Sequence, residues 1–354
     1  MIKPFHLRNM PLVAHLQQVG VSLDIEEQLT YPRSPLRSLL IDMVFSPRSG
    51  PSTFIFDQYD EQGRHTGVAQ MRSRPGRAEQ DVVFMSPALD SGNGSHAIWQ
   101  RLLTHLCIQT AEQGCLRLYA RLGSESEELQ LFKNVGFVEY SQEEIYKLEP
   151  AALPPQDEEA SLQLRPQIPS DGWGLQKLYT ASTPRAVQNS EGLAQGQWAL
   201  AGRTWTEPGH RAGYVWEDGG ELLGALHIRT GHQGHWIQTL LHPDANDQAA
   251  ALGKAALGLT RSQPQRPVYF AYRHYELGWS AILTDLGFAP LTVQALVVKP
   301  MAIRVREPSR EQQAVESAAT NALGIRQAPQ KTPTSPMTPA STTATQSRTE
   351  YPTL

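Results

Sequence analysis

Hydrophobic and polar residues along this chain follow two spacings, which separate predicted strands from predicted helices. Short runs rich in β-branched and aromatic residues, such as Asp-Val-Val-Phe-Met at 81–85, predict strands, and Pro87 ends that one. Ile98, Leu102 and Leu106 recur at helical spacing, and Gly114 closes that helix. The first 150 residues thus predict strands at 2–7, 53–56, 66–71, 81–85, 115–120 and 145–148, with helical stretches at 12–19, 98–114 and 127–135.

The same order of predicted elements returns after residue 160. A strand is expected first, then a helix whose N-cap is Ser170 or Asp171. The pattern predicts strands at 162–164, 214–216, 222–229, 236–241, 268–272 and 293–298, and helices at 172–180, 248–260 and 279–286.

Four local similarities in one order indicate that the chain contains a duplication. Residues 5–8 resemble 162–165 and residues 67–72 resemble 224–229, both at an offset of 157. The segment 84–87 resembles 240–243 at an offset of 156, and the Gly-Phe segment 131–137 resembles 282–288 at an offset of 151. Four matches at nearly one spacing predict two related domains of ordinary size.

Composition sets the boundaries between these domains. A stretch rich in proline and acidic residues at 151–160 predicts a linker between a first domain at 1–150 and a second at 161–305. Gln, Thr, Ser, Pro and Ala dominate residues 306–354, and such a segment cannot bury enough apolar surface to offset chain entropy. We therefore expect a disordered C-terminal tail.

Charge and residue usage exclude several classes of partner. The net charge is −4, with 31 Lys and Arg against 35 Asp and Glu, so no basic field exists to hold a nucleic acid. No apolar run is long enough for a membrane span and no signal-peptide core opens the chain, which predicts a cytoplasmic protein without membrane contact. Its two cysteines and scattered histidines lack metal-site spacing, and we expect no bound metal.

Each repeat contains a strand ending at a proline, a short loop that opens a helix, a second strand, and a helix ending in Gly-Phe. This order resembles the GNAT superfamily of acyl-coenzyme A-dependent N-acyltransferases, over residues 1–149 and 161–300. The resemblance implies an α+β fold of two GNAT-like domains, each a mixed, mostly antiparallel sheet flanked by helices. It also implies that the strands on either side of the helix part, with the coenzyme A arm in the gap and its pyrophosphate at the helix N-terminus, where free amides and the helix dipole favour anions.

The family's phosphate loop reads Gln/Arg-x-x-Gly-x-Gly/Ala and begins three residues after the proline. In this chain the matching segments are 90–95 (Asp-Ser-Gly-Asn-Gly-Ser) and 246–251 (Asn-Asp-Gln-Ala-Ala-Ala), and neither has the leading Gln or Arg. The first is rich in glycine, whereas Asp244 and Asp247 place negative charge at the second, so the first is favoured if only one binds the cofactor. The cofactor-binding residues implied are Met85, Ser91, Gly92, Asn93, Gly94, Ser95, Leu241, Gln248, Ala249 and Ala251.

The family's catalytic step is attack of an amine on the thioester, which needs a base and an acid for the departing thiolate. The usual acid is a tyrosine five residues before the Gly-Phe phenylalanine, but those positions hold Phe132 and Leu283. Candidate substitutes are side chains on or just past the strands that border the gap, and a histidine or carboxylate there could act as a base. They are His235, Tyr275, Glu276 and Tyr119.

Two functions follow from this resemblance. The first is an N-acyltransferase that moves acetyl from acetyl-CoA to a primary amine by direct attack, in a monomer whose two domains pair within one chain. The alternative is a catalytically silent duplicated scaffold that serves as a ligand-binding or protein-interaction module, which the missing tyrosines favour.

Overall fold

The structure is a computed structural model that describes residues 1–45, 52–61, 63–74, 76–92, 94–152, 162–192, 198, 209–261 and 265–301. One compact unit runs from Met1 to Arg304. Asn93, most of the expected linker and the expected tail lie outside the described residues. The domain boundaries at 150 and 161 therefore stay a prediction, and the two repeats are treated below as the first half and the second half.

The first half confirms the predicted order of strands and helices and adds short elements near the N-terminus that the sequence pattern did not indicate. The added elements are β2, α2 and α3. The full set is β1 (Ile2–Pro4), α1 (Met10–Leu16), β2 (Val21–Ser22), α2 (Ile25–Thr30), α3 (Pro35–Phe45), β3 (Thr53–Asp60), β4 (Gly63–Ser73), β5 (Glu79–Ser86), α4 (Ser95–Glu112), β6 (Arg117–Gly123), α5 (Glu127–Asn134) and β7 (Val138–Leu148).

The second half repeats the order of the predicted elements, has no described counterpart of β2, and adds α7, which the sequence pattern did not indicate. Its elements are β8 (Leu164–Pro166), α6 (Gly172–Ser182), α7 (Arg185–Ser190), β9 (His210–Asp218), β10 (Glu221–Thr230), β11 (His235–Leu241), α8 (Ala249–Thr260), β12 (Val268–Arg273), α9 (Trp279–Asp285) and β13 (Ala289–Pro300). Single 3₁₀ turns lie at Leu7–Asn9, Leu89–Ser91, Pro150–Ala152 and Pro169–Asp171, and a longer 3₁₀ segment with a kink at Ala245 lies at Pro243–Gln248. Among the described residues, no helix combines the length and the apolar character that a membrane crossing needs.

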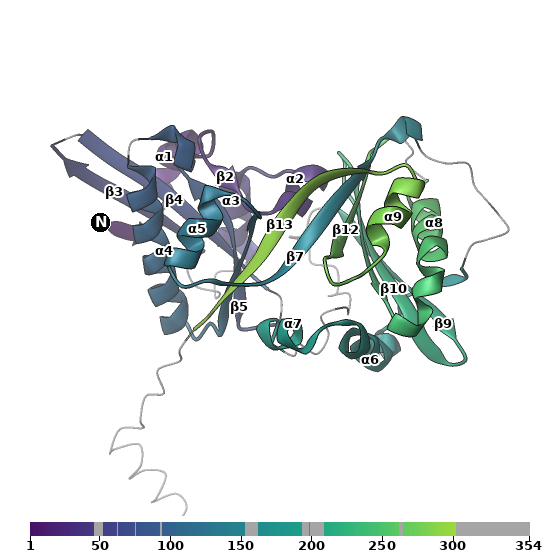
Figure 1. Ribbon diagram of the computed structural model, residues 1–354. Coiled ribbons are helices and arrows are strands. Elements are labelled where there is room, and N and C mark those ends of the chain that lie inside the picture. The colour runs from purple at the N-terminus through teal and green to yellow at the C-terminus, as the bar shows by residue number, and fades with distance from the viewer. Residues whose placement is uncertain are drawn as a thin grey trace, which may run out of the picture. The chain divides into compact units, whose positions relative to one another are not determined.

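The strands form one mixed sheet in the order β1-β3-β4-β5-β6-β13-β7-β12-β11-β10-β9-β8 (Figure 1). Among the described strands, only β5 with β6 and β11 with β12 pair in parallel, and the other neighbours are antiparallel. Helices flank the sheet, so the predicted α+β architecture of mixed, mostly antiparallel strands is confirmed. The final strands of the halves are exchanged: β13 pairs with β6 of the first half, and β7 pairs with β12 of the second.

This exchange completes the hydrophobic core of each half. The core under α4 and α5 contains Trp99 and Phe132 together with Ala295 and Val297 of β13. The core under α8 and α9 contains Phe270 and Trp279 together with Leu148 of β7. Burying one such aliphatic side chain stabilises the fold by about 1.5–3 kcal/mol. Neither core is complete without a strand from the other half.

The opposite face of the sheet carries the remaining helices. α1 packs on the first half through Val13 and Leu16, and α6 packs on the second half through Leu175 and Leu178. Between them lies α2, a first-half helix whose Ile25 and Leu29 pack against strands of the second half. The first half therefore covers part of the second.

Candidate functional site

In both halves the two parallel strands pair briefly and their ladder then ends. β5 pairs with β6 from Glu79 to Asp81, and β11 pairs with β12 from His235 to Gln238. Beyond these points β5 continues to Ser86 and β11 to Leu241, each followed by a helix, α4 or α8. The parting of strands implied by the sequence resemblance is thus present twice.

In the first half, β4 pairs along one edge of β5, and β6 pairs along the other edge only as far as Asp81. Beyond Asp81, β2 of the same chain pairs with this second edge in place of β6. Val21 pairs with Met85 and Ser22 with Phe84, and the Leu23 N–H donates to the Val83 carbonyl at 2.8 Å. Met85, a predicted cofactor contact, is fully buried under this pairing.

Gly20 allows β2 to approach β5 this closely. A Cβ atom at position 20 would lie 2.8 Å from the Ser86 Cβ and 2.9 Å from the Met85 carbonyl oxygen. Both distances are shorter than ordinary van der Waals contact, so only glycine fits without a shift of backbone.

In the second half, the repeat alignment places Thr239 and Leu241 where the first half has Val83 and Met85. The His242 N–H donates to Leu223, which sets the register with β10 and turns the backbone groups of Thr239 and Leu241 toward the β12 side. No described residue pairs with that edge beyond Gln238. The Thr239 side chain is 3% exposed, and its hydroxyl also has no hydrogen-bond partner in the described part of the chain.

The segments that lead into the N-termini of α4 and α8 differ as well. Before α4, the hydroxyls of Ser91 and Ser95 donate to backbone carbonyls, at 2.6 Å to Ala88 and 2.8 Å to Leu89, and are not aimed at a ligand. Gly92 and Gly94 have positive φ angles with open space around their Cα atoms.

Before α8, Gln248 is the N-cap residue and its amide donates to Asp247 at 2.8 Å. Ala249 and Ala250 form the first helical positions; the Ala249 N–H donates to the Asn246 carbonyl, and Ala250 is exposed. Predicted contact Ala251 follows in the same turn. The N-terminus of α8 thus lies next to the part of β11 that has no strand partner among the described residues on its β12 side.

The structure separates the four predicted catalytic residues. His235 is buried at the paired start of β11, with its Nδ1 3.3 Å from the Thr230 hydroxyl. Tyr119 lies on β6, where its hydroxyl donates to the Ser190 carbonyl at 3.1 Å and the Arg74 guanidinium stacks on its ring. Neither residue faces the point where β11 and β12 part.

Tyr275 and Glu276 lie together just after β12. The Arg273 N–H donates to the Glu276 carboxylate at 2.9 Å. Burial raises the pKa of Glu276 to about 7, although Arg273 lowers it in part. Burial also raises the pKa of Tyr275 above its ordinary value of 10, so its hydroxyl keeps its proton at neutral pH.

Sequence reasoning missed a buried carboxylate at the parting of β11 and β12. Glu143 of the exchanged strand β7 is 1% exposed and accepts hydrogen bonds from Gln238 at 3.1 Å and from Gln294 at 2.5 Å. Arg273 and Arg121 lie 3.5 Å and 3.9 Å from its oxygens. Because β7 belongs to the first half in sequence, no local pattern could have placed this residue in the second half.

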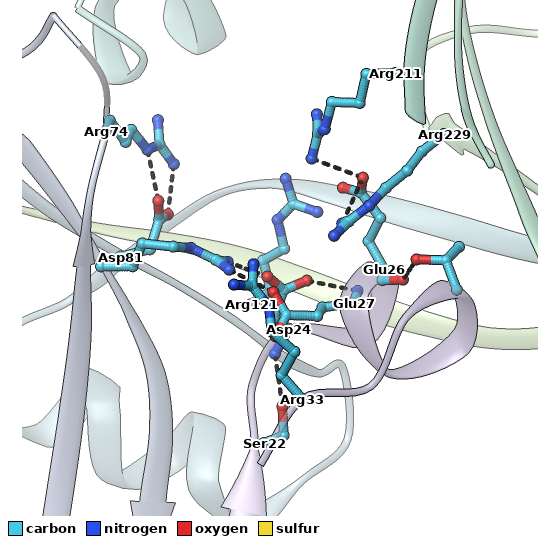
Figure 2. A network of polar contacts seen from close by, with 12 residues as sticks. Ser22, Asp24, Glu26, Glu27, Arg33, Arg74, Asp81, Arg121, Arg211 and Arg229 are labelled. Carbon is cyan, nitrogen blue, oxygen red and sulfur yellow. Dashed lines mark hydrogen bonds and ion pairs between the residues drawn. The ribbon is translucent and has the colours of Figure 1, made fainter. Parts of the chain in front are cut away.

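A network of charges extends from this point over the same face of the sheet (Figure 2). Helix α2 contributes Asp24 as its N-cap, together with Glu26 and Glu27. Arg72 of the first half contacts Asp24 and Glu27, while Arg211 and Arg229 of the second half contact Glu26 at 2.9 Å and 3.1 Å. The acids of one short helix thus pair with guanidinium groups from both halves.

A parted pair of parallel strands followed by a helix, repeated twice in one sheet, defines the class of fold. Among solved structures, the chain is similar to a GCN5-related N-acetyltransferase from Sphaerobacter thermophilus, with a TM-score of 0.51 and 14% identity over 87% of this chain and 97% of that one. The described chain therefore has the GNAT fold, and the resemblance that the sequence indicated is confirmed at the level of fold.

Two further similarities are weaker. A GCN5-related N-acetyltransferase from Anabaena variabilis gives a TM-score of 0.43 at 13% identity, over 85% of this chain and 73% of that one. A tandem GNAT protein from the clavulanic acid biosynthesis pathway gives 0.46 at 16% identity, over 85% and 98%. No family model and no curated protein matches the sequence.

Proposed function

We propose that the protein is an N-acyltransferase that moves an acetyl group from acetyl-CoA to a primary amine, and that the second half holds the donor. The edge of β11 that no described strand pairs with beyond Gln238, beside the N-terminus of α8, is the observation that carries this proposal. The sequence favoured the first half, but there the corresponding edge is taken by β2.

The chemistry of coenzyme A fits this edge. Its amide-bearing arm needs backbone partners, which the Thr239 carbonyl and the Leu241 peptide groups supply as strand edges do. Its diphosphate favours a helix N-terminus without bulky side chains, and we assign it to the first turn of α8, where the side chains of Ala250 and Ala251 are small. Asp247 beside this turn bonds to Gln248, which partly satisfies its charge.

Tyr275 and Glu276 are the residues that we assign to proton transfer. The amine nitrogen attacks the thioester carbon and the C–S bond breaks, so one proton leaves the amine and one joins the thiolate. A carboxylate with a pKa of about 7 can accept the first proton at neutral pH. The protonated Glu276 carboxyl can then return that proton to the thiolate, while the tyrosine beside it keeps its own proton at that pH and can donate a hydrogen bond to the leaving sulfur.

Binding and turnover test the proposal separately. Isothermal titration of the full chain with acetyl-CoA should show binding, and thiol release should require an added primary amine. The Glu276→Gln variant should bind acetyl-CoA as the wild type does and release thiol at least about tenfold more slowly, as expected for loss of a general base. An absence of binding heat at millimolar acetyl-CoA would end the enzyme proposal.

The alternative of a silent binding scaffold keeps one supporting observation. Phe132 and Leu283, which replace the family's tyrosine, are fully buried in the two cores and cannot donate a proton. Acetyl-CoA binding without thiol release across small amines, amino acids and peptides would favour that alternative over catalysis.

A further inference from the structure

We propose that β2 acts in the first half as a built-in substitute for the cofactor arm, so that the chain binds one acyl-CoA, and that this occupied cleft serves to hold α2 across the second half. The inference rests on the proposed function for the second half and extends it to the role of the first.

The first step is that β2 uses the same backbone groups that a ligand would need. Val83 and Met85 are bonded to Leu23 and Val21, whereas on the equivalent edge the Thr239 carbonyl and the Leu241 peptide groups lie beyond the β12 ladder and have no partner within the described chain. The Ala88 N–H also donates to the Val19 carbonyl at 2.7 Å, and the Ser86 hydroxyl donates to the Leu16 carbonyl at 2.7 Å. A cofactor arm could enter only by replacing this ladder.

The second step is that no side-chain gap separates β2 from β5. The missing Cβ of Gly20 would lie 2.9 Å from the Met85 carbonyl oxygen. The two backbones are therefore in direct contact, and the cleft is filled by the chain itself.

The third step is that the end of β2 and the start of α2 are separated only by Leu23 and Asp24. α2 packs Ile25 and Leu29 against Trp236 and Tyr269 of the second half. Displacement of β2 by a cofactor arm would therefore also displace α2 from the second half.

The far end of α2 is fixed as well. The Gln233 N–H donates to the Thr30 carbonyl at 3.0 Å, and the rings of Tyr31 and His232 meet edge to face at 4.5 Å. A Cβ at Gly231 would overlap the Thr30 carbonyl oxygen, so the turn between β10 and β11 is shaped to receive the end of this helix. The first half thus supports the strand, β11, that carries the proposed donor site.

The test is titration of the full chain with coenzyme A, using matched charge substitutions in the first turns of α4 and α8. Ala97 and Ala250 are both exposed there, and glutamate near a helix N-terminus favours the helix while repelling a diphosphate. Ala97→Gln and Ala250→Gln are the neutral controls. We expect the wild type to bind one equivalent of coenzyme A per chain. Ala97→Glu should leave the affinity for coenzyme A unchanged. Ala250→Glu should lower that affinity roughly tenfold or more, which corresponds to about 1.4 kcal/mol of binding free energy.

Other outcomes overturn the inference in distinguishable ways. Two equivalents per chain, or an affinity loss confined to Ala97→Glu, would refute the closed first cleft and leave acyl-CoA binding intact. No binding by the wild type would refute both this inference and the proposed function. One equivalent without turnover on any amine would refute the transferase and leave the inference standing.

Hydrogen exchange checks the proposed link between β2 and α2. A Gly20→Val variant that stays folded should exchange faster at the Leu23 amide and also at the Gln233 amide, which lies in the second half. Faster exchange at Leu23 alone would show that α2 holds its position without β2.

Discussion

The Glu26→Gln substitution tests whether α2 is held on the second half by charge. Glu26 is 6% exposed and faces Arg229, which is 4% exposed, at 3.1 Å and Arg211 at 2.9 Å. The substitution keeps the shape of the side chain and removes its charge, leaving a buried guanidinium opposite a neutral amide.

The magnitude follows from the burial of each partner. Breaking a buried ion pair by removing one charge costs about 3–5 kcal/mol. Arg211 has 45% of its side chain exposed, so solvent screens that pair and it adds little. The new amide retains one acceptor, and a hydrogen bond recovers about 1 kcal/mol. We therefore expect the free energy of unfolding to fall by roughly 2–4 kcal/mol, nearly all from Arg229.

Urea unfolding followed by tryptophan fluorescence measures this loss, with Glu221→Gln as the control. Glu221 pairs with Lys177 at 2.6 Å, but both side chains are more than half exposed, and its substitution should change stability little. If Glu26→Gln were no more costly than Glu221→Gln, the charged docking of α2 would not contribute to stability and the reasoning would be refuted.

The same variant predicts a pH dependence. Burial alone would raise the pKa of Glu26, but Arg211 and Arg229 outweigh burial and the pKa lies below its ordinary 4.5. Between these values the unfolded chain holds more protons than the folded one, so the stabilisation is complete above pH 4.5 and is lost as pH falls through the folded pKa. The difference between wild type and Glu26→Gln should shrink correspondingly in acid, and a constant difference would contradict this assignment.

Three further predictions address the interface and the proposed site. Gly231→Ala should destabilise the protein by about 1–3 kcal/mol because its Cβ meets the Thr30 carbonyl. Gly258→Ala, on an open helix face, should instead stabilise it by about 0.5–1 kcal/mol. Thermal unfolding compares the two variants, and equal effects would refute the close approach of Gly231 to Thr30. Since the pKa of Glu276 is raised to about 7, its charge costs stability as pH rises from 4.5 to 7, so Glu276→Gln should raise the melting temperature relative to wild type at pH 8 and not at pH 4.5. Thr239→Val removes a buried hydroxyl that has no described hydrogen-bond partner. Calorimetry should show weaker acetyl-CoA binding, with an unchanged or higher free energy of unfolding. An unchanged affinity for acetyl-CoA would remove Thr239 from the site.

Local signals in the sequence were enough for the repeat, the order of most elements and the GNAT resemblance. The run at 81–85 and the spacing of Ile98, Leu102 and Leu106 mark a strand and a helix because side-chain periodicity is set by the backbone of each element alone. Gly136 and Gly287 end their helices at positive φ for the same local reason.

Tertiary structure decided which segments meet. Nothing in the pattern of β7 or β13 distinguishes pairing within a half from exchange between halves, since both present the same alternating faces to a neighbour. The exchange is what brings Glu143 of the first half beside Gln238 of the second.

The same limit applies to the choice of cleft. Glycines at 92 and 94 favoured the first half, but the covering of Met85 by Val21 depends on a contact between segments more than sixty residues apart in the chain. The sequence by itself determined that a strand, a helix and a second, parallel strand would follow one another in each half, because each such unit is built from consecutive elements. Only the tertiary structure decided that β2 pairs with the parted edge of β5 in the first half, because that depends on how the chain folds back over its own strand edges.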